Sequence, residues 1–128
     1  MPWTARHDPS RDIVELVCGG TMTASDLHEA TTRCILLSKQ KGSIKFLVDA
    51  AEIELAASIF DLYDLPSRQY VEEGADRLSR IAVILPTDPK EIDSVKFYEL
   101  ACRNRGWHVE SFPDRDGALS WLLGEREP

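Results

Sequence analysis

Short hydrophobic runs in the first half of the chain predict β-strands. Residues 3–6, 13–18 and 44–48 each have the length and the β-branched or aromatic content that are typical of strands. The glycine pair at 19–20 is expected to close the second strand, because adjacent glycines usually mark a turn. Asp49 is expected to end the third strand. Only a short turn separates the first two runs, so they are expected to pair as an antiparallel hairpin.

Between the second and third strands, hydrophobic residues recur every three or four positions, which is the spacing of one face of an α-helix. The helix is expected to begin after Thr23 or Ser25, since either side chain can cap its first amide groups, and to continue to about Gln40. Gly42 suits the left-handed position that ends many helices. The predicted buried stripe comprises Leu27, Ala30, Cys34 and Leu37.

A second helical pattern runs from about residue 55 to residue 64. Pro66 is expected to end or kink this helix, because proline has no amide hydrogen and crowds the preceding turn. Residues 68–73 have the pattern of a further helical turn or two, and Gly74 then breaks it. The predicted buried side of the second helix comprises Leu55, Ile59 and Leu62.

The C-terminal part of the chain has the pattern of strand, helix, strand and helix. Residues 81–85 are hydrophobic at every position, as expected for a strand that is covered on both faces. Asp88, followed by a proline, provides a helix cap and a suitable first helical residue, and Gly106 ends that helix. A looser alternation over residues 107–112 predicts a strand near a sheet edge, and Asp116 is expected to cap a final helix.

Strands that alternate with helices predict an α/β fold with right-handed crossovers and with helices on at least one face of the sheet. The length of 128 residues fits a single domain over residues 1–128. Within it we expect a mixed β-sheet of about five strands, parallel through its later members.

Several short motifs then occur in a characteristic order. They are GTMTASDL at 20–27, FLVD at 46–49, DLP at 64–66, RIAV at 80–83, FYE at 97–99, NRG at 104–106, VESF at 109–112 and ALSWL at 118–122. In order and spacing they resemble the small SpoIIAA-like proteins, a bacterial group also described as STAS/SEC14-domain proteins. The resemblance covers about residues 13–123. It implies a STAS-like fold, in which helices pack mainly on one face of a mixed sheet.

The resemblance also implies a possible phosphosite. In the anti-sigma-factor antagonists that give this fold its name, a serine opens the helix after the central strand, and its phosphorylation breaks partner binding. The nearest counterpart here is Ser58. The Asp-Ser-Ser-Gly pattern of those antagonists is absent, and alanines stand where its polar residues would be. A phospho-regulated switch at Ser58 is therefore an alternative to a serine that only caps the helix.

Composition and charge exclude several classes of function. A net charge of −7 opposes broad binding to the phosphates of nucleic acids. No hydrophobic run approaches the ~18 residues of a membrane span, and residues 1–3 do not have the pattern of a signal peptide. We therefore expect a cytoplasmic protein. The odd number and wide separation of the 3 cysteines predict buried, reduced thiols.

Candidate catalytic groups are few. Cys18 stands beside a glycine pair, but a catalytic cysteine needs a nearby base, which the sequence does not identify. Asp61 and Asp64 can share one helical face, where paired carboxylates perform acid–base chemistry if they are buried. A small enzyme that uses Cys18 or these carboxylates is a second alternative. The histidines have no metal-ligand spacing, and we expect neither a metal nor a cofactor.

The second predicted helix carries more hydrophobic side chains than one buried stripe requires. A hydrophobic patch that remains after the core is filled usually marks a binding surface. Our leading hypothesis is a non-enzymatic module that binds a protein partner or a small apolar ligand around this helix and forms a homodimer. The residues expected to form the surface are Ser58, Ile59, Phe60, Leu62 and Tyr63.

Overall fold

The computed structural model describes residues 2–124 and contains a five-stranded sheet with the strand order β1-β2-β3-β4-β5. β1 and β2 form an antiparallel hairpin, whereas β2, β3, β4 and β5 are parallel neighbours. The mixed sheet predicted from the sequence is therefore confirmed. The strands are β1 (Trp3–Asp8), β2 (Ile13–Thr23), β3 (Lys45–Ala56), β4 (Arg80–Ile84) and β5 (His108–Phe112).

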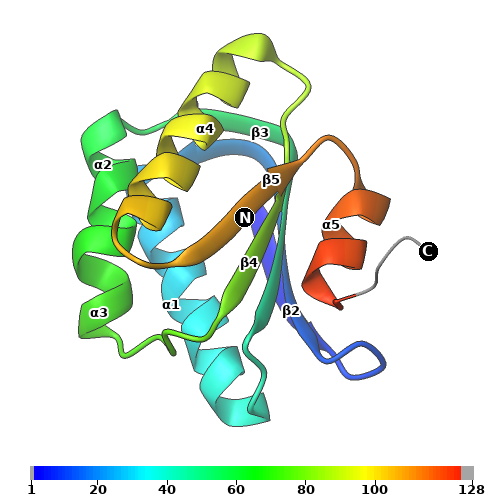
Figure 1. Ribbon diagram of the computed structural model, residues 1–128. Coiled ribbons are helices and arrows are strands. Elements are labelled where there is room, and N and C mark those ends of the chain that lie inside the picture. The colour runs from blue at the N-terminus through cyan, green and yellow to red at the C-terminus, as the bar shows by residue number, and fades with distance from the viewer. Residues whose placement is uncertain (1, 125–128) are drawn as a thin grey trace.

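The helices lie mainly on one face of this sheet, as predicted. Crossovers that move in one direction across a parallel sheet keep one hand, so their helices share a face. Accordingly, α1 to α4 lie together on one side, while α5 follows the last strand and covers the opposite side (Figure 1). The helices are α1 (Ala24–Lys41), α2 (Ile59–Asp64), the π-helical turn η1 (Leu65–Gln69), α3 (Tyr70–Glu72), α4 (Pro89–Asn104) and α5 (Arg115–Leu122).

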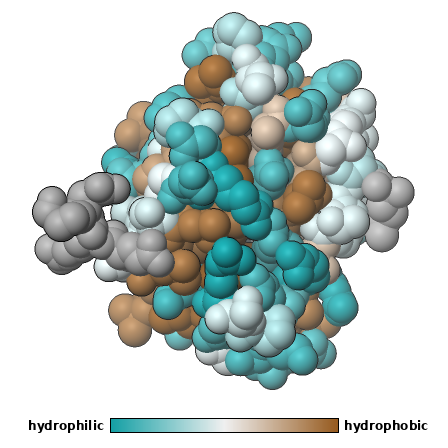
Figure 2. All heavy atoms as spheres, turned by 90° about the vertical axis from the view of Figure 1, so that its right-hand side faces the viewer, coloured by the Kyte–Doolittle hydropathy of each residue, from teal (hydrophilic) through white to brown (hydrophobic). Residues whose placement is uncertain are grey.

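Alternation along the strands divides the core into two layers, because successive side chains of a strand point to opposite faces. The layer under α5 contains Ile13, Leu47, Ala82, Ile84, Ala118 and Leu122. The layer under α1 to α4 contains Val14, Phe46, Ile81, Val83, Trp107 and Val109, among others. On the α5 side, buried Glu15 pairs with Arg115 of α5 at 2.8 Å and with Arg6 at 3.1 Å. Hydrophilic and hydrophobic groups are mixed over the surface of that side (Figure 2).

Two strands are longer than the sequence pattern predicted. β2 does not end at the glycine pair but continues to Thr23, and β3 passes Asp49 and continues to Ala56. The register shifts between Val17 and Gly19, where β3 has one more residue than β2 between Asp49 and Glu52, and beyond this bulge in β3 the two extensions pair with each other. Gly20 has a φ of 129°, which a residue with a side chain rarely adopts, so the extended β2 requires glycine there.

The second helix also differs from its prediction. It begins at Ile59 rather than near residue 55, so Leu55 belongs to β3 and not to the helix. Pro66 neither ends nor breaks the helical path, because the chain widens to a π-helical turn in which the N–H of Tyr70 donates to the carbonyl of Leu65. The further turn of α3 and its end near Gly74 are confirmed.

The caps predicted for α1 and α4 are confirmed, whereas the cap predicted for α5 is wrong. Thr23 caps α1 and Gly42 ends it in the left-handed conformation, with a φ of 65°. Asp88 caps α4, with a proline at its first position. The cap of α5 is Asp114 and not Asp116, because the Asp114 carboxylate accepts the N–H of Gly117 at 2.8 Å.

Candidate functional site

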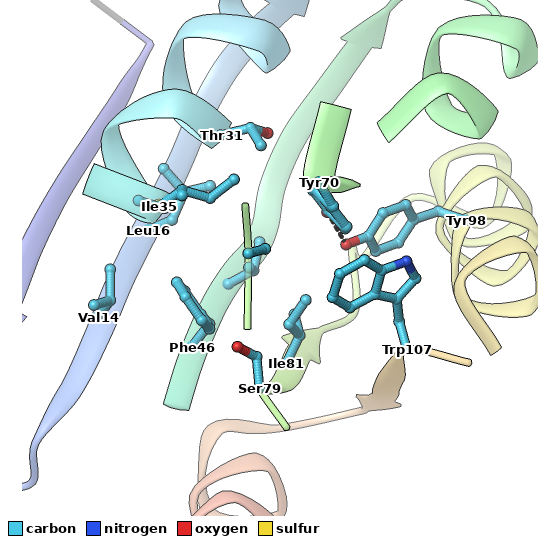
Figure 3. Close-up of a pocket in the computed structure, with 13 residues that line it drawn as sticks. Val14, Leu16, Thr31, Ile35, Phe46, Tyr70, Ser79, Ile81, Tyr98 and Trp107 are labelled. Carbon is cyan, nitrogen blue, oxygen red and sulfur yellow. Dashed lines mark hydrogen bonds between the residues drawn. The ribbon is translucent and has the colours of Figure 1, made fainter. Parts of the chain in front are cut away.

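The helical side of the sheet is hollow. An outer cavity of about 60 Å³ and an inner cavity of about 90 Å³ lie between the sheet and the helices. Figure 3 shows the outer cavity, with side chains of α1 on one side and Tyr70, Tyr98 and Trp107 on the other. The residues that line both cavities are Leu16, Thr31, Val48, Tyr70 and Tyr98. Since they share these walls, we treat the two cavities as neighbouring chambers of one site.

The walls of this site are almost entirely hydrophobic. The outer cavity continues over Val14, Cys34, Ile35, Phe46, Ala75, Ser79, Ile81 and Trp107. The inner cavity continues over Cys18, Leu27, Ala30, Ala50, Ile53, Leu55, Leu62, Leu65, Val83, Ser94 and Val95. None of the described residues that line either cavity is charged. A hydrophobic cavity of this kind stays dry and accepts apolar molecules.

Polar groups from three helical segments organise the centre of the site. The hydroxyls of Tyr70 and Tyr98 are 2.5 Å apart and hydrogen-bond to each other (Figure 3). Burial raises the pKa of both phenols well above the usual value, so both stay neutral. Trp107 packs edge-on against Tyr70 and donates its indole N–H to the carbonyl of Pro66 at 3.1 Å. That carbonyl is available because the π-helical turn directs the N–H of Tyr70 to Leu65 instead.

Hydrogen bonds join α1 to the segment that follows α2. The side-chain amide of buried Gln69 donates to the carbonyl of His28 at 2.9 Å and to the carboxylate of Glu73 at 3.0 Å. Thr32 also donates to that carboxylate, and the Lys39 ammonium donates to the Glu73 carbonyl at 2.6 Å. These contacts hold α1 and residues 69–73 together over the cavities.

A more polar groove opens beside the outer cavity. It has a volume of about 290 Å³ and shares Ile35, Phe46 and Ala75 with the outer cavity. Its remaining wall comprises Ser38, Lys39, Gly42, Ile44, Gly74 and Asp76. We call it the mouth groove, since it lies between the outer cavity and the surface at the C-terminal end of α1.

The structure divides the residues of the predicted binding surface between two faces of α2. Leu62 is buried and lines the inner cavity. Ile59, Phe60 and Tyr63 point outward, with 52%, 78% and 42% of their surfaces exposed. The prediction that Ile59 is buried beside Leu62 is therefore wrong, because the helix begins later and presents another face to the sheet.

Ser58 is exposed and caps α2. Its hydroxyl accepts the N–H of Asp61 at 3.2 Å, and the Asp61 carboxylate accepts the N–H of Ser58 at 2.8 Å. This reciprocal pair is a capping box. A phosphoryl group on Ser58 would face the Asp61 carboxylate, and like charges repel. The phosphosite stays a prediction.

The candidate catalytic groups lie in surroundings that lower their reactivity. Burial raises the pKa of the Cys18 thiol to about 12, and the charge of Asp49 adds to this shift. Cys34 and Cys102 have pKa values raised to about 12 by burial as well, and all three cysteines are free and buried, as predicted. Hydrogen bonds from Arg68 hold the pKa of Asp64 below its usual range, so this carboxyl is a poor proton donor.

The sequence analysis did not identify the residues that define the site. Tyr70 and Trp107 fall in a predicted helical turn and a predicted edge strand, Ser79 precedes the predicted strand over residues 81–85, and nothing in their local pattern distinguishes them. They meet only because crossovers bring segments that are far apart in the sequence to one end of the sheet. A weak signal exists in Tyr98, which lies at helical spacing from Val95 and Cys102 although its hydroxyl requires a partner when buried.

Over residues 2–124, no cluster of three or more His, Cys, Asp or Glu side chains is placed to hold a metal ion. In the same part of the chain, none of the helices combines the length and the hydrophobic character needed to cross a membrane.

Comparison with known proteins supports the fold. No protein-family model and no curated protein matches the sequence. Among solved structures, the chain is similar to an uncharacterised protein of the DUF3478 family from Shewanella loihica PV-4, whose crystal structure has a SpoIIAA-like fold. The similarity covers 94% of this chain and 93% of that chain, with a TM-score of 0.61 and 21% sequence identity. The resemblance stated from the sequence is thus confirmed at the level of the fold.

Proposed function

From the SpoIIAA-like fold and the hollow helical layer, we propose that the protein is a non-enzymatic module that binds a small apolar molecule between the sheet and α1 to α4. The observation that carries this proposal is the pair of hydrophobic cavities with five shared wall residues. Interiors of proteins are normally close-packed, and voids larger than a water molecule are few. Two such voids side by side, next to a groove that opens to the surface, form a ligand site more readily than a packed core.

The size of the cavities limits the ligand. An engineered apolar cavity of about 150 Å³ binds benzene. The outer and inner cavities, at about 60 and 90 Å³, have a comparable volume when occupied together. The proposed ligand is therefore of the size of an aromatic ring or a short aliphatic chain.

The alternative of a small enzyme has less support. A nucleophilic cysteine needs a lowered pKa, whereas burial raises the pKa of Cys18 to about 12. Asp64 is held as a carboxylate by Arg68, and Asp61 is engaged in the capping box.

A location in the cytoplasm fits the buried, reduced thiols, since reducing compartments preserve them.

Binding can be tested directly with benzene as a probe. We expect benzene to stabilise the native protein against heat and to shift NMR signals of Val48, Tyr70 and Tyr98. Ala50→Leu should abolish both effects, because Ala50 lines the inner cavity and is 2% exposed. Leu36→Asn is the matched control, since Leu36 is exposed on α1 outside the cavities. The absence of any benzene effect on the native protein contradicts the proposal, and native mass spectrometry of fresh protein identifies a co-purifying molecule.

A second candidate function is self-association through the outer surface of α2. Ile59, Phe60 and Tyr63 form a hydrophobic group on that surface, and a phenylalanine that is 78% exposed is unfavourable in a monomer. In a homodimer the same patch would serve on both copies. Light scattering should give a dimer mass for the native protein and a monomer mass for Phe60→Glu. Leu100→Glu, at an exposed site of α4, should leave the mass unchanged. A native monomer excludes this candidate.

A further inference from the structure

One polar group in the outer cavity has no partner within the protein. Ser79 is only 3% exposed, and among the residues that the structure describes none hydrogen-bonds to its hydroxyl. Native structures pair most buried polar side chains, because a buried hydroxyl without a partner destabilises the folded state. A buried hydroxyl that has no partner and lines a cavity indicates a group that hydrogen-bonds to a ligand in that cavity.

The position of Ser79 supports this interpretation. The serine lines the outer cavity, and its oxygen is directed toward the Phe46 side of the cavity (Figure 3). Its own N–H donates to the carbonyl of Asp76 at 3.0 Å, which closes a turn. Asp76 and Ala75 also line the mouth groove. The free hydroxyl therefore lies in the outer cavity toward Phe46, a residue that the mouth groove also contains.

The two phenol hydroxyls at the centre of the site are already paired. Tyr70 and Tyr98 hydrogen-bond to each other at 2.5 Å. A ligand that competed for either phenol would break this bond, whereas a ligand that bonded to Ser79 would break none. Ser79 is thus a better anchor for a polar atom of the ligand than either phenol.

The charge of the ligand is limited by the walls. The described residues around both cavities include hydrophobic, hydroxyl and thiol side chains but no charged one. Transfer of an ionised carboxylate into such surroundings is far more unfavourable than one hydrogen bond to a serine is favourable. The ligand is therefore neutral.

We propose that Ser79 anchors a small neutral lipophile by a hydrogen bond to its single hydroxyl or carbonyl oxygen, while the hydrophobic body of the ligand occupies the outer and inner cavities. A serine hydroxyl both donates and accepts, so it can pair with either kind of oxygen. This inference rests on the proposed function and adds the chemistry of the ligand to it.

Three probes of nearly equal size test the inference: toluene, benzyl alcohol and benzoate. Their dissociation constants are measured by NMR titration for the native protein and for Ser79→Ala. We expect Ser79→Ala to weaken benzyl alcohol about 5-fold, the equivalent of one ordinary hydrogen bond, and to leave toluene unchanged. Benzoate should bind neither protein in the cavity.

Ser94→Ala is the matched control, since Ser94 lines the inner cavity and is not proposed to anchor the ligand. It should leave the ratio of the benzyl alcohol and toluene constants unchanged. If toluene binds the native protein but Ser79→Ala does not change this ratio, the anchor is wrong and the proposed function stands. If benzoate binds in the cavity as tightly as benzyl alcohol, the neutral class is wrong. If neither toluene nor benzyl alcohol binds, both the inference and the proposed function fail.

Discussion

Buried polar side chains around the helical layer fall into two groups, according to whether the protein itself pairs them. On α4, the Glu91 carboxylate accepts the N–H of Leu55 at 3.1 Å, and the Glu99 carboxylate accepts the N–H and the hydroxyl of Ser111 at 2.9 and 2.7 Å. Such pairs join elements. Ser79 instead presents its hydroxyl to a cavity. At this scale the sequence gives no guidance, because each partner comes from a distant segment and each glutamate looks like an ordinary surface residue of a helix.

Glu99 should make the stability of the protein depend on pH. Burial alone would raise its pKa, but the hydrogen bonds from Ser111 and the charges of Lys96 and Arg103 outweigh burial and lower it from 4.5. A lowered folded-state pKa means that Glu99 stabilises the fold above its unfolded pKa and loses this effect as the pH falls through the folded one.

The expected result concerns Glu99→Gln. At neutral pH the variant should unfold at a lower urea concentration, with a loss of about 1–2 kcal/mol, because a neutral amide accepts weaker hydrogen bonds. The difference from the native protein should shrink between about pH 5 and pH 3. Urea unfolding across this range measures it. A difference that is constant with pH contradicts the assignment.

The cysteines should be unreactive in the folded protein. Only the thiolate attacks alkylating reagents, and the pKa values of Cys18, Cys34 and Cys102 are raised to about 12 by burial. We expect iodoacetamide at neutral pH to label the native protein slowly, and to label all three thiols rapidly in urea, as counted by mass spectrometry. Fast labelling of Cys18 alone in the native state would support the alternative of an enzyme that uses Cys18.

At the scale of elements, the errors of the sequence analysis come from two places where a distant partner decided the local structure. The glycine pair at 19–20 has a turn-like sequence, but the N–H of Gly19 donates to the carbonyl of Pro2 and the pair lies within β2. The extended β2 then pairs with residues 52–56. Here Glu52 and Glu54 alternate with Ile53 and Leu55, a period of two that predicts a strand. This signal was present, but the strand was predicted to end at Asp49 and Leu55 was predicted to belong to the second helix.

The segment around Pro66 shows how the fold uses an irregular helix. Proline removes one helical hydrogen bond, and the π-helical turn frees the carbonyl of Pro66 for Trp107. The same turn buries Gln69, which is 1% exposed, against the backbone of α1. The amide of Gln69 thus connects α1 to the segment that follows α2. No hydrophobic stripe was predicted to join these two elements.

Loss of this connection should loosen residues 65–73. Gln69→Leu removes the donor to the His28 carbonyl and the Glu73 carboxylate, so we expect a loss of about 1–3 kcal/mol and faster hydrogen exchange over the segment. Ser67→Ala is the control, because Ser67 donates only within its own helical segment, to the carbonyl of Tyr63. It should cost less than about 0.5 kcal/mol. Equal effects of the two variants would rule out a connecting role for Gln69.

For the whole molecule, the order of strands and helices was sufficient to predict the architecture. Right-handed crossovers between parallel neighbours leave few arrangements of the helices around five strands, and hydrophobic runs such as residues 81–85 identify the inner strands. The cavities could not be predicted in this way. They arise because the side chains between the sheet and α1 to α4 do not fill all of the space there. The hydrophobic pattern of a single segment does not reveal such a shortfall in volume. Both cavities lie on the face of the sheet that α1 to α4 cover.

A pair of buried alanines on neighbouring strands distinguishes the two faces of the sheet. Ala50 of β3 lines the inner cavity, whereas Ala82 of β4 packs under α5 with Leu47 and Leu122. Ala50→Val adds two methyl groups where space exists, and Ala82→Val adds the same groups where it does not. We expect Ala50→Val to keep or raise the stability, and Ala82→Val to lose about 1–3 kcal/mol through overpacking.

Pressure unfolding, followed by tryptophan fluorescence, adds a readout that stability alone does not give. The volume decrease on unfolding scales with the internal void that unfolding eliminates. Ala50→Val should therefore make this decrease smaller, and Ala82→Val should leave it unchanged. Equal losses of stability in the two variants, with equal unfolding volumes, would mean that the helical layer is packed in solution. The ligand site requires that the two variants differ in stability and in unfolding volume. The reason is that the void that pressure eliminates on unfolding is the space in which an apolar molecule would bind.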